Sequence, residues 1–263
     1  MSTVILQEQH APARIDVHSV SIEVGPPDAR IKTLEGLDVT IAPGEFVCVL
    51  GPSGCGKSTL LGAIAGHIAA SNGEIIVDGL KVDRPHPERG LVFQQHTLFP
   101  WKRVIDNVAF GLKMKGLGAH ERRRQALDLL ELVGLSGFEA HYPAELSGGM
   151  QQRVEIARVL INRPRVLLMD EPFGALDAQT RRMMQTLLLD IWSRLRTTVV
   201  FVTHDIEEAL FLSDRILVLS RRPARIVADI RVPLTRPRRD ETTVDTVFID
   251  IKRQCLALLR EDE

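Results

Sequence analysis

Residues 51 to 58 have the types and spacing of a phosphate-binding loop. They match the pattern G-x-x-x-x-G-K-[ST] and stand between an apolar, β-rich run, 45–50, and an apolar helical run that begins at Leu60. Glycines let the backbone curl so that successive N–H groups point at phosphate oxygens, and a following helix adds the positive end of its dipole. The predicted loop comprises Gly51, Pro52, Ser53, Gly54, Cys55, Gly56, Lys57, Ser58 and Thr59.

The polar residues of this loop suit a nucleoside triphosphate. Lys57 is expected to reach the β- and γ-phosphates, and the Ser58 hydroxyl is expected to bind Mg²⁺, with Thr59 supporting the loop. Cys55 stands at a free position of the pattern, where a small side chain fits without a chemical role.

Two adjacent carboxylates end a second apolar strand, 166–169. Asp170 and Glu171 directly follow a buried strand, and burying their carboxylates would cost free energy unless a cation or a proton neutralised the charge. We expect Asp170 to hold the metal through its water shell and Glu171 to orient the attacking water. The alternative is that the pair caps the next helix.

A third apolar strand, 198–203, is followed by His204. Ligands of open parallel sheets bind at the carboxyl ends of the strands, so His204 is expected at the same edge as Lys57 and Asp170. It is therefore predicted to contact the γ-phosphate.

These strand ends must be positioned by an α/β fold, because short apolar runs at 45–50, 165–170 and 198–203 alternate with helical stretches. Near the N-terminus, the loosely alternating run 15–24 and the strand with an Asp-Gly turn at 73–79 predict an antiparallel sheet.

A helical subdomain is predicted at about 95–160, inserted into the sheet-bearing core. Its clearest helix follows Arg124, where Ala126, Leu129, Leu130 and Val133 recur at helical spacing.

The overall composition narrows the class of protein. A formal charge of −1 argues against nucleic-acid binding through net charge, and the three cysteines are too few and scattered for a disulfide framework or a zinc site. No apolar run approaches the roughly 18 residues of a membrane helix. Residues 1–9 lack the pattern of a secretory signal, which predicts a cytoplasmic chain.

Segment 146–153, Leu-Ser-Gly-Gly-Met-Gln-Gln-Arg, resembles the LSGGQ signature of ATP-binding cassette (ABC) ATPases. The other markers of that family occur along the chain in the expected order. Gln94, before the signature, resembles the Q-loop glutamine, and after it Asp177 resembles the D-loop aspartate and His204 the H-loop histidine. The resemblance implies a P-loop NTPase core with a mostly parallel sheet, an N-terminal antiparallel β subdomain and an inserted helical subdomain. The ATPase domain would span 13–240, and 241–263 would form a helical tail.

The resemblance also implies how the site works. Two copies would form a head-to-tail dimer around two ATP and Mg²⁺, and the signature of one copy would close on the γ-phosphate held by Lys57 of the other. Asp177 would touch the partner's phosphate loop, and Gln94 would contact the metal and join Glu171 and His204 in the catalytic set. The implied signature contacts are Ser147, Gly148, Gly149 and Gln151.

Several features point to a transport branch of this family. The interval between Gln94 and Leu146 leaves no room for the coiled-coil arm of DNA-repair relatives, and the chain has one cassette, unlike ribosome-acting relatives. Similarity is greatest to importers of taurine, aliphatic sulfonates and nitrate, with the taurine type nearest. The stretches that carry it are 98–101, 106–112, 171–178 and 203–209.

This branch implies a peripheral subunit at the cytoplasmic face of the cell membrane. Its partners would be two integral membrane permease subunits and, indirectly, a solute-binding protein, without nucleic acid. Taurine or another sulfonate is the predicted solute, with nitrate, bicarbonate or an aminopyrimidine as alternatives. An alternative of another class is a non-transport ATP switch that regulates a soluble partner.

Segments 96–101 and 107–112 mix aromatic and apolar residues beside Gln94. They predict a groove for a short helix of a membrane partner, or, alternatively, ordinary core of the helical subdomain.

Three further features concern the ends of the cassette. Family members stack adenine on an aromatic residue of the first strand, but 15–30 contains none, which leaves Val24 or Ile22 in its place. Residues 221–239 hold seven arginines and one acid, which favours a solvated surface on late strands over contact with anionic lipids. The tail is predicted to contain an amphipathic helix at 241–260 whose apolar residues are Val244, Val247, Ile251, Leu256 and Leu259.

Overall fold

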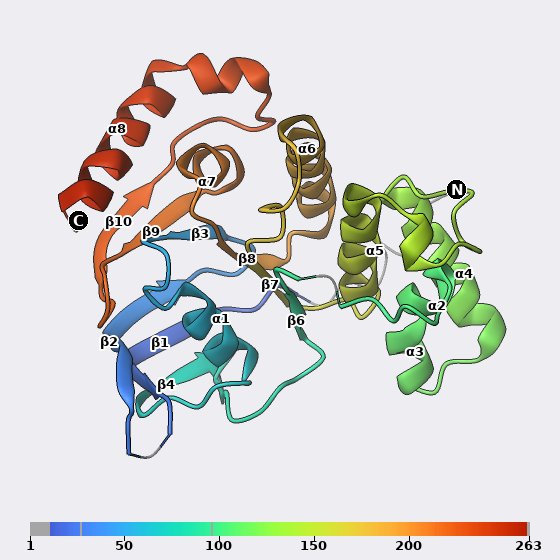
Figure 1. Cartoon of the computed structure of the whole chain (residues 1–263), viewed down its shortest axis with the longest axis horizontal. Helices are drawn as coiled ribbons and strands as arrows, with labels where there is room; N and C mark the ends of the chain where they lie inside the picture. Colours follow the sequence, from blue (N-terminus) through green and yellow to red (C-terminus); the bar gives the residue numbers. More distant parts are fainter. Residues whose placement is uncertain (1–10, 27, 96, 262–263) are drawn as a thin grey trace.

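A six-stranded sheet forms the centre of the computed structural model, which describes residues 11–26, 28–95 and 97–261 (Figure 1). Neighbouring strands are parallel from β9 to β6, whereas β10 at the edge runs antiparallel to β9. In spatial order the strands are β10 (Ile226–Arg231), β9 (Arg215–Leu219), β3 (Phe46–Leu50), β8 (Thr198–Val202), β7 (Val166–Asp170) and β6 (Arg89–Val92). The predicted mostly parallel α/β core is confirmed.

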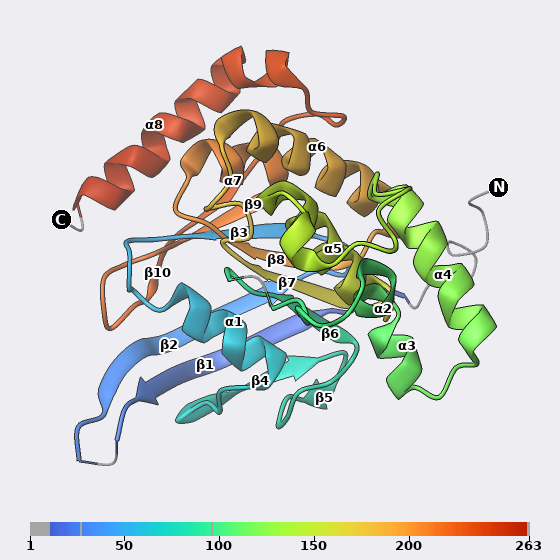
Figure 2. The ribbon, with the colours of Figure 1, turned by 45° about the vertical axis from the view of Figure 1, so that its right-hand side comes forward.

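A second, four-stranded antiparallel sheet holds the N-terminal part of the chain. Helix α1 (Lys57–Ala65) lies between the two sheets (Figure 2), and its Leu60, Leu61 and Ile64 belong to the core that joins them. The strands are, in spatial order, β2 (Ile31–Ile41), β1 (Ile15–Val24), β4 (Asn72–Val77) and β5 (Leu80–Lys81). The antiparallel sheet predicted from the N-terminal pattern is therefore present.

Successive side chains of β3 point to opposite faces of the sheet and belong to two different hydrophobic cores. Phe46, Cys48 and Leu50 pack with the helices on one face, whereas Val47 and Val49 pack toward α1 on the other. Both faces of this strand are buried, as its continuous apolar sequence requires. The helices on the first face include α6 (Ala178–Leu195), α7 (Ile206–Leu212) and α8 (Thr246–Glu261).

A helical insert occupies the chain between β6 and β7 and lies to one side of the sheets (Figure 1). In α4 the buried residues are Ala126, Leu129 and Leu130, three of the four that the helical spacing picks out, and the fourth, Val133, is buried at the helix end. The insert comprises α2 (Val104–Val108), α3 (Phe110–Met114), α4 (Ala119–Leu132), the short turn η1 (Pro143–Glu145) and α5 (Gly148–Leu160).

The C-terminal tail forms a helix, but its buried stripe differs from the predicted one. A short turn, η2 (Asp240–Val244), precedes α8, so Val244 lies outside the helix and its side chain is 74% exposed. Phe248, Ile251 and Cys255 form the stripe that α8 packs against α7. Residues 262 and 263 lie outside the described residues, as do residues 1–9 of the predicted N-terminal pattern.

The prediction of a solvated arginine-rich surface is wrong for Arg238, which is 4% exposed. Its guanidinium donates hydrogen bonds to carbonyl oxygens of α7, of the residue after it and of the segment that follows β10. Burial, and then the charge of Arg236, lower the pKa of Arg238 to about 10, so it stays charged at neutral pH. The acceptors are the carbonyls of Leu210, Phe211, Ser213, Val232 and Leu234.

No helix in the described part of the chain is long and apolar enough to cross a membrane.

Arg238→Met is expected to lower the free energy of unfolding by about 3 kcal/mol, because it leaves buried carbonyls without donors. Urea unfolding followed by circular dichroism measures this change. Arg231→Met, at an exposed position of β10, is the matched control and is expected to change stability by less than about 0.5 kcal/mol. Equal free energies of unfolding for the two variants would show that the hydrogen bonds of the Arg238 guanidinium do not stabilise the fold.

Candidate nucleotide-binding site

Parallel pairing brings the predicted polar residues to one edge of the central sheet. Phe201 of β8 lies beside Cys48 of β3 on one side and Met169 of β7 on the other. The chain after each strand therefore leaves at the same edge, where the phosphate loop, Asp170–Glu171 and His204 lie.

The phosphate loop owes its shape to glycines with positive φ. Gly54 has φ 74° and Gly56 has φ 125°. A Cβ on Gly56 would lie 2.8 Å from the side chains of Thr33 and Leu34 on β2, so no larger residue fits there. Gly56 also precedes α1 without a side-chain cap, which leaves the first N–H groups of the helix available to an anion.

Lys57 lies inside the loop and is only 5% exposed. Its Nζ donates hydrogen bonds to the carbonyl oxygens of Gly51 (2.9 Å) and Pro52 (3.0 Å). The ammonium group is thus held at the centre of the curled backbone, where a phosphate chain would lie. Cys55, 2% exposed, packs beneath the loop beside Gly51, as its small size suggested.

The Ser58 hydroxyl donates a hydrogen bond of 3.0 Å to Oδ1 of Asp170. Burial raises the pKa of Asp170 and the nearby Glu171 charge adds to this, although the Ser58 bond and Lys57 oppose it. A cation at these two oxygens would stabilise the buried carboxylate, and hydroxyl and carboxylate oxygens are ligands that Mg²⁺ accepts.

No group of three or more His, Cys, Asp or Glu side chains in the described residues could hold a metal alone. Mg²⁺ is usually bound by one or two protein ligands together with substrate phosphates and water, so the Ser58–Asp170 pair fits that ion.

Glu171 and His204 meet at 3.0 Å between Oε2 and Nδ1. Glu171 has φ 42°, a strained value for a non-glycine residue, and its N–H donates to the carbonyl of Val202 at the end of β8 (3.0 Å). The strained backbone directs its side chain to His204. The N-terminal cap of the next helix, α6, is Asp177, which disfavours the alternative that Asp170 and Glu171 serve as its cap.

A hollow of about 320 Å³ lies between the phosphate loop and Glu171. Gln94, Glu171 and Val24 line it together with every phosphate-loop residue from Ser53 to Thr59 except Cys55, whereas Ile22 is fully buried. Of the two residues expected in place of the aromatic ring, only Val24 lines this hollow. The hollow has two further lining residues that the sequence patterns missed, Thr33 and Arg222.

A second hollow, of about 650 Å³, lies on the other side of the loop and is lined by Gly51–Cys55, His204, Arg221, Arg222 and Leu259.

The signature residues line neither hollow beside the phosphate loop. The Ser147 hydroxyl caps α5 by accepting from the N–H of Met150 (3.4 Å), and Gln151 Nε2 donates to the carbonyl of Pro143 (2.9 Å). A Cβ on Gly149 would lie 2.5 Å from Thr180 of α6, whereas one on Gly148 would meet nothing closer than 3.9 Å.

Asp177 likewise lies outside both hollows. Its carboxylate accepts from the N–H of Thr180 (3.0 Å), which lowers its pKa. One chain therefore brings together Lys57, Ser58, Gln94, Asp170, Glu171 and His204, but neither Asp177 nor the signature.

Known proteins similar to this chain are named as ATP-binding proteins. Residues 34–174 match the model of the ABC transporter family. The chain is 52% identical over 232 residues to the taurine import ATP-binding protein of Rhizobium johnstonii, covering 88% of this chain and 87% of the other. It is 49% identical over 224 residues to the nitrate import ATP-binding protein of Synechocystis sp., covering 85% and 83% respectively.

Among solved structures, a dimeric ATP-binding cassette in a post-hydrolysis state, bound to ADP and Pi, superposes with a TM-score of 0.74 at 33% identity, covering 84% of this chain and all of that one. With the geometry of the phosphate loop and its neighbouring carboxylates, these similarities identify the chain as an ATP-hydrolysing, ATP-binding member of the ABC transporter family.

Proposed function

We propose that this protein is the motor subunit of an importer for a small organic anion, best assigned as taurine or another sulfonate. The observation that carries the proposal is the convergence of two polar pairs, Ser58–Asp170 and Glu171–His204, on the phosphate loop. The 52% identity to a taurine import ATP-binding protein supports the solute class.

Each residue of the site has a proposed part in hydrolysis. Lys57 and the loop N–H groups hold the phosphates of ATP, and Ser58, Asp170 and Gln94 hold Mg²⁺, which when bound neutralises charge on the phosphates. Glu171 holds the attacking water and takes its proton. His204, at 3.0 Å from Glu171, keeps that carboxylate in place and contacts the γ-phosphate.

The signature is proposed to complete the site of a second copy. Ser147 caps α5, but a Cβ on Gly148 would make only an ordinary contact, 3.9 Å from Leu176, so packing within one chain does not require a glycine there. A helix N-terminus with free N–H groups attracts an anion, and close approach of a phosphate requires the missing side chain. The solved relative bound to ADP and Pi is a dimer. We therefore assign Ser147, Gly148, Gly149 and Gln151 to the partner's ATP in a head-to-tail dimer, with Asp177 at the partner's phosphate loop.

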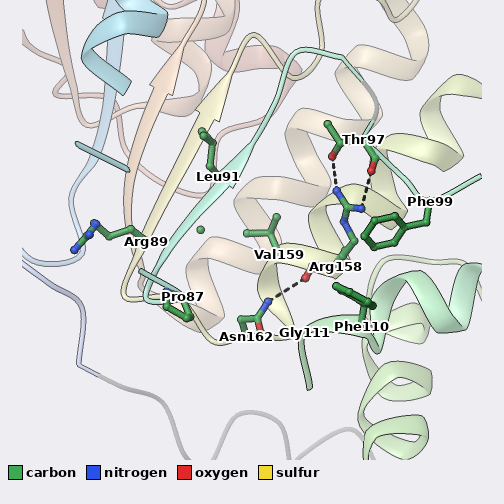
Figure 3. A pocket seen from close by; sticks show the side chains of 11 residues that line it. Pro87, Arg89, Leu91, Thr97, Phe99, Phe110, Gly111, Arg158, Val159 and Asn162 are labelled. Carbon is green, nitrogen blue, oxygen red and sulfur yellow. Dashed lines mark hydrogen bonds between the residues drawn. The ribbon is translucent and has the colours of Figure 1, made fainter. Parts of the chain in front are cut away.

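A pocket of about 340 Å³ beside the Q-loop segment is proposed to accept a short cytoplasmic helix of a permease. Figure 3 shows the Phe99 and Phe110 rings facing this pocket together with the Arg158 side chain. The rings lie 4.8 Å apart between centroids, and Arg158 lies over Phe99. A largely apolar surface with two arginines, Arg89 and Arg158, suits an amphipathic helix. We call this pocket the coupling groove.

The two segments predicted for the groove divide between its surface and the core. Phe99, Phe110 and Gly111 line it, whereas Val108 and Leu112 are buried in the helical insert, as the alternative held. Buried Asn107 joins the two segments, because its side chain accepts from the N–H of Phe99 and donates to nearby carbonyls. His96 lies outside the described residues.

The coupling groove is tied to the signature helix. Arg158 of α5 donates to the carbonyl of Thr97 (2.8 Å) and to the Thr97 hydroxyl, and Glu155 of α5 accepts from the N–H of Thr97. Arg158 and Glu155 also pair with each other at 3.0 Å (Figure 3 shows the bonds from Arg158 to Thr97). A helix that enters the groove would therefore move α5 and the signature with the segment after Gln94.

This arrangement requires a place at the cytoplasmic face of the cell membrane, where two permease subunits hold the dimer and a solute-binding protein delivers the solute from outside. The transported anion never contacts this chain. A motor of this kind could equally drive uptake of nitrate, bicarbonate or an aminopyrimidine.

Glu171→Gln is expected to lower ATP turnover at least about 100-fold, because the amide cannot take a proton from water. ATP-induced dimers are expected to persist, as seen by size-exclusion chromatography. Phosphate release measures turnover, and Asp190→Asn, at an exposed position of α6, is the control. Near-normal turnover of the Glu171 variant would overturn its assignment as the general base.

Trp101→Asp is expected to release the protein from membranes that contain its permease. Trp101 is 71% exposed and packs 5.6 Å from Phe99 at the rim of the coupling groove, so the charge disturbs docking and not the core. Membrane fractionation after co-expression with a permease of the taurine-importer type measures the effect. Leu80→Asp, 74% exposed on β5, is the matched control. A wild-type protein that remains wholly soluble there would favour the ATP switch.

The solute is tested with the complete transporter in proteoliposomes. Taurine together with a taurine-specific solute-binding protein is expected to stimulate ATP hydrolysis several-fold, because loaded binding protein favours closure of the dimer. Nitrate, bicarbonate and an aminopyrimidine are tested in parallel. Stimulation by one of these and not by taurine or another sulfonate would reassign the solute.

A further inference from the structure

The turn between β9 and β10 is fastened to β2 next to the phosphate loop. The N–H of Ala224 donates to the carbonyl of Thr33 (2.9 Å), and the N–H of Glu35 donates to the carbonyl of Ala224 (3.0 Å). Arg225 adds an ion pair with Glu35 at 2.7 Å. Thr33 itself lines the smaller hollow, so these bonds hold the turn at the edge of the nucleotide site.

Arg222 extends from this turn over the phosphate loop. Its Nη2 would lie 2.9 Å from a Cβ on Gly54, and Arg222 lines both hollows beside the loop. Burial raises the pKa of the Cys55 thiol, while the charges of Lys57 and Arg222 lower it. The guanidinium is therefore close enough to act electrostatically on a side chain of the loop.

Within the parts of the chain that the structure describes, the exposed side chain of Arg222 has neither a hydrogen bond nor an ion pair. Arg225, three residues on, is by contrast paired with Glu35. An unpaired guanidinium beside a loop built to bind phosphates is placed to meet an anion.

We propose that Arg222 is a further nucleotide-binding residue, whose guanidinium donates hydrogen bonds to the phosphate chain of ATP. The contact would offset the loss of the aromatic stack at Val24, because a charge-assisted hydrogen bond contributes as much as stacking one base. Since it is made to phosphate, it does not depend on the base. The proposal rests on ATP binding by this family member and not on the transported solute.

Arg222→Ala is expected to weaken binding of Mg·ATP, Mg·GTP and Mg·tripolyphosphate by similar factors, about ten-fold each. Displacement of a fluorescent ATP analogue from the purified full chain measures all three affinities. Arg222→Lys, which keeps the charge but not the fork of donors, is expected to lose less. Thermal unfolding without nucleotide checks that each variant is folded.

Arg231→Ala, an exposed charge removal on β10, is the matched control for a general change in electrostatic field. Equal affinities of the Arg222 and Arg231 alanine variants would overturn the proposal. A loss confined to ATP, with tripolyphosphate unaffected, would also overturn it, because the guanidinium would then contact the base. Failure of the wild type to bind any nucleotide would instead contradict the ATP-binding function.

Discussion

The parallel pairing of β3, β8 and β7 is the constraint on which the rest of the site depends. Because the three strands end at one edge, the phosphate loop, the Asp170–Glu171 pair and His204 meet there although long stretches of chain separate them. A shift in register would separate Ser58 from Asp170, now 3.0 Å apart. The strained φ of Glu171 shows how closely that position is determined, since packing around it must offset about 1–3 kcal/mol.

Near-neutral net charge is consistent with a site that binds a highly charged ligand, because the positive potential is local. Backbone N–H groups of the loop and the start of α1 contribute partial charges to it, and Lys57 supplies a full charge at the centre. The proposed contact from Arg222 adds a second charge from outside the loop. Binding then depends on geometry more than on the charge of the whole molecule.

Much of this site could be predicted because its residues lie within short patterns. The loop from Gly51 to Thr59, the acids after β7 and His204 after β8 each follow an apolar strand, and strand ends of a parallel sheet share an edge. Arg222 was not predictable in this way, since its place depends on a turn that pairs with β2, far away in sequence. Burial of Arg238 and the stripe of α8 likewise depend on which surfaces of α7 and β10 they meet, which local periodicity does not specify.

The hydrogen bonds between Thr97 and α5 offer a physical route by which the proposed membrane partner would act on hydrolysis. Glu155 is buried and its carboxylate accepts from Thr97, so the segment after Gln94 cannot move without breaking that bond or moving α5. Breaking it would leave a buried carboxylate with one partner fewer, which costs more than a rigid shift. Movement in the proposed coupling groove would therefore be transmitted to Ser147 at the other end of α5. If a helix binds in the groove and ATP binds at the signature, as proposed, both would bias the same element, which is what coupling between two sites requires.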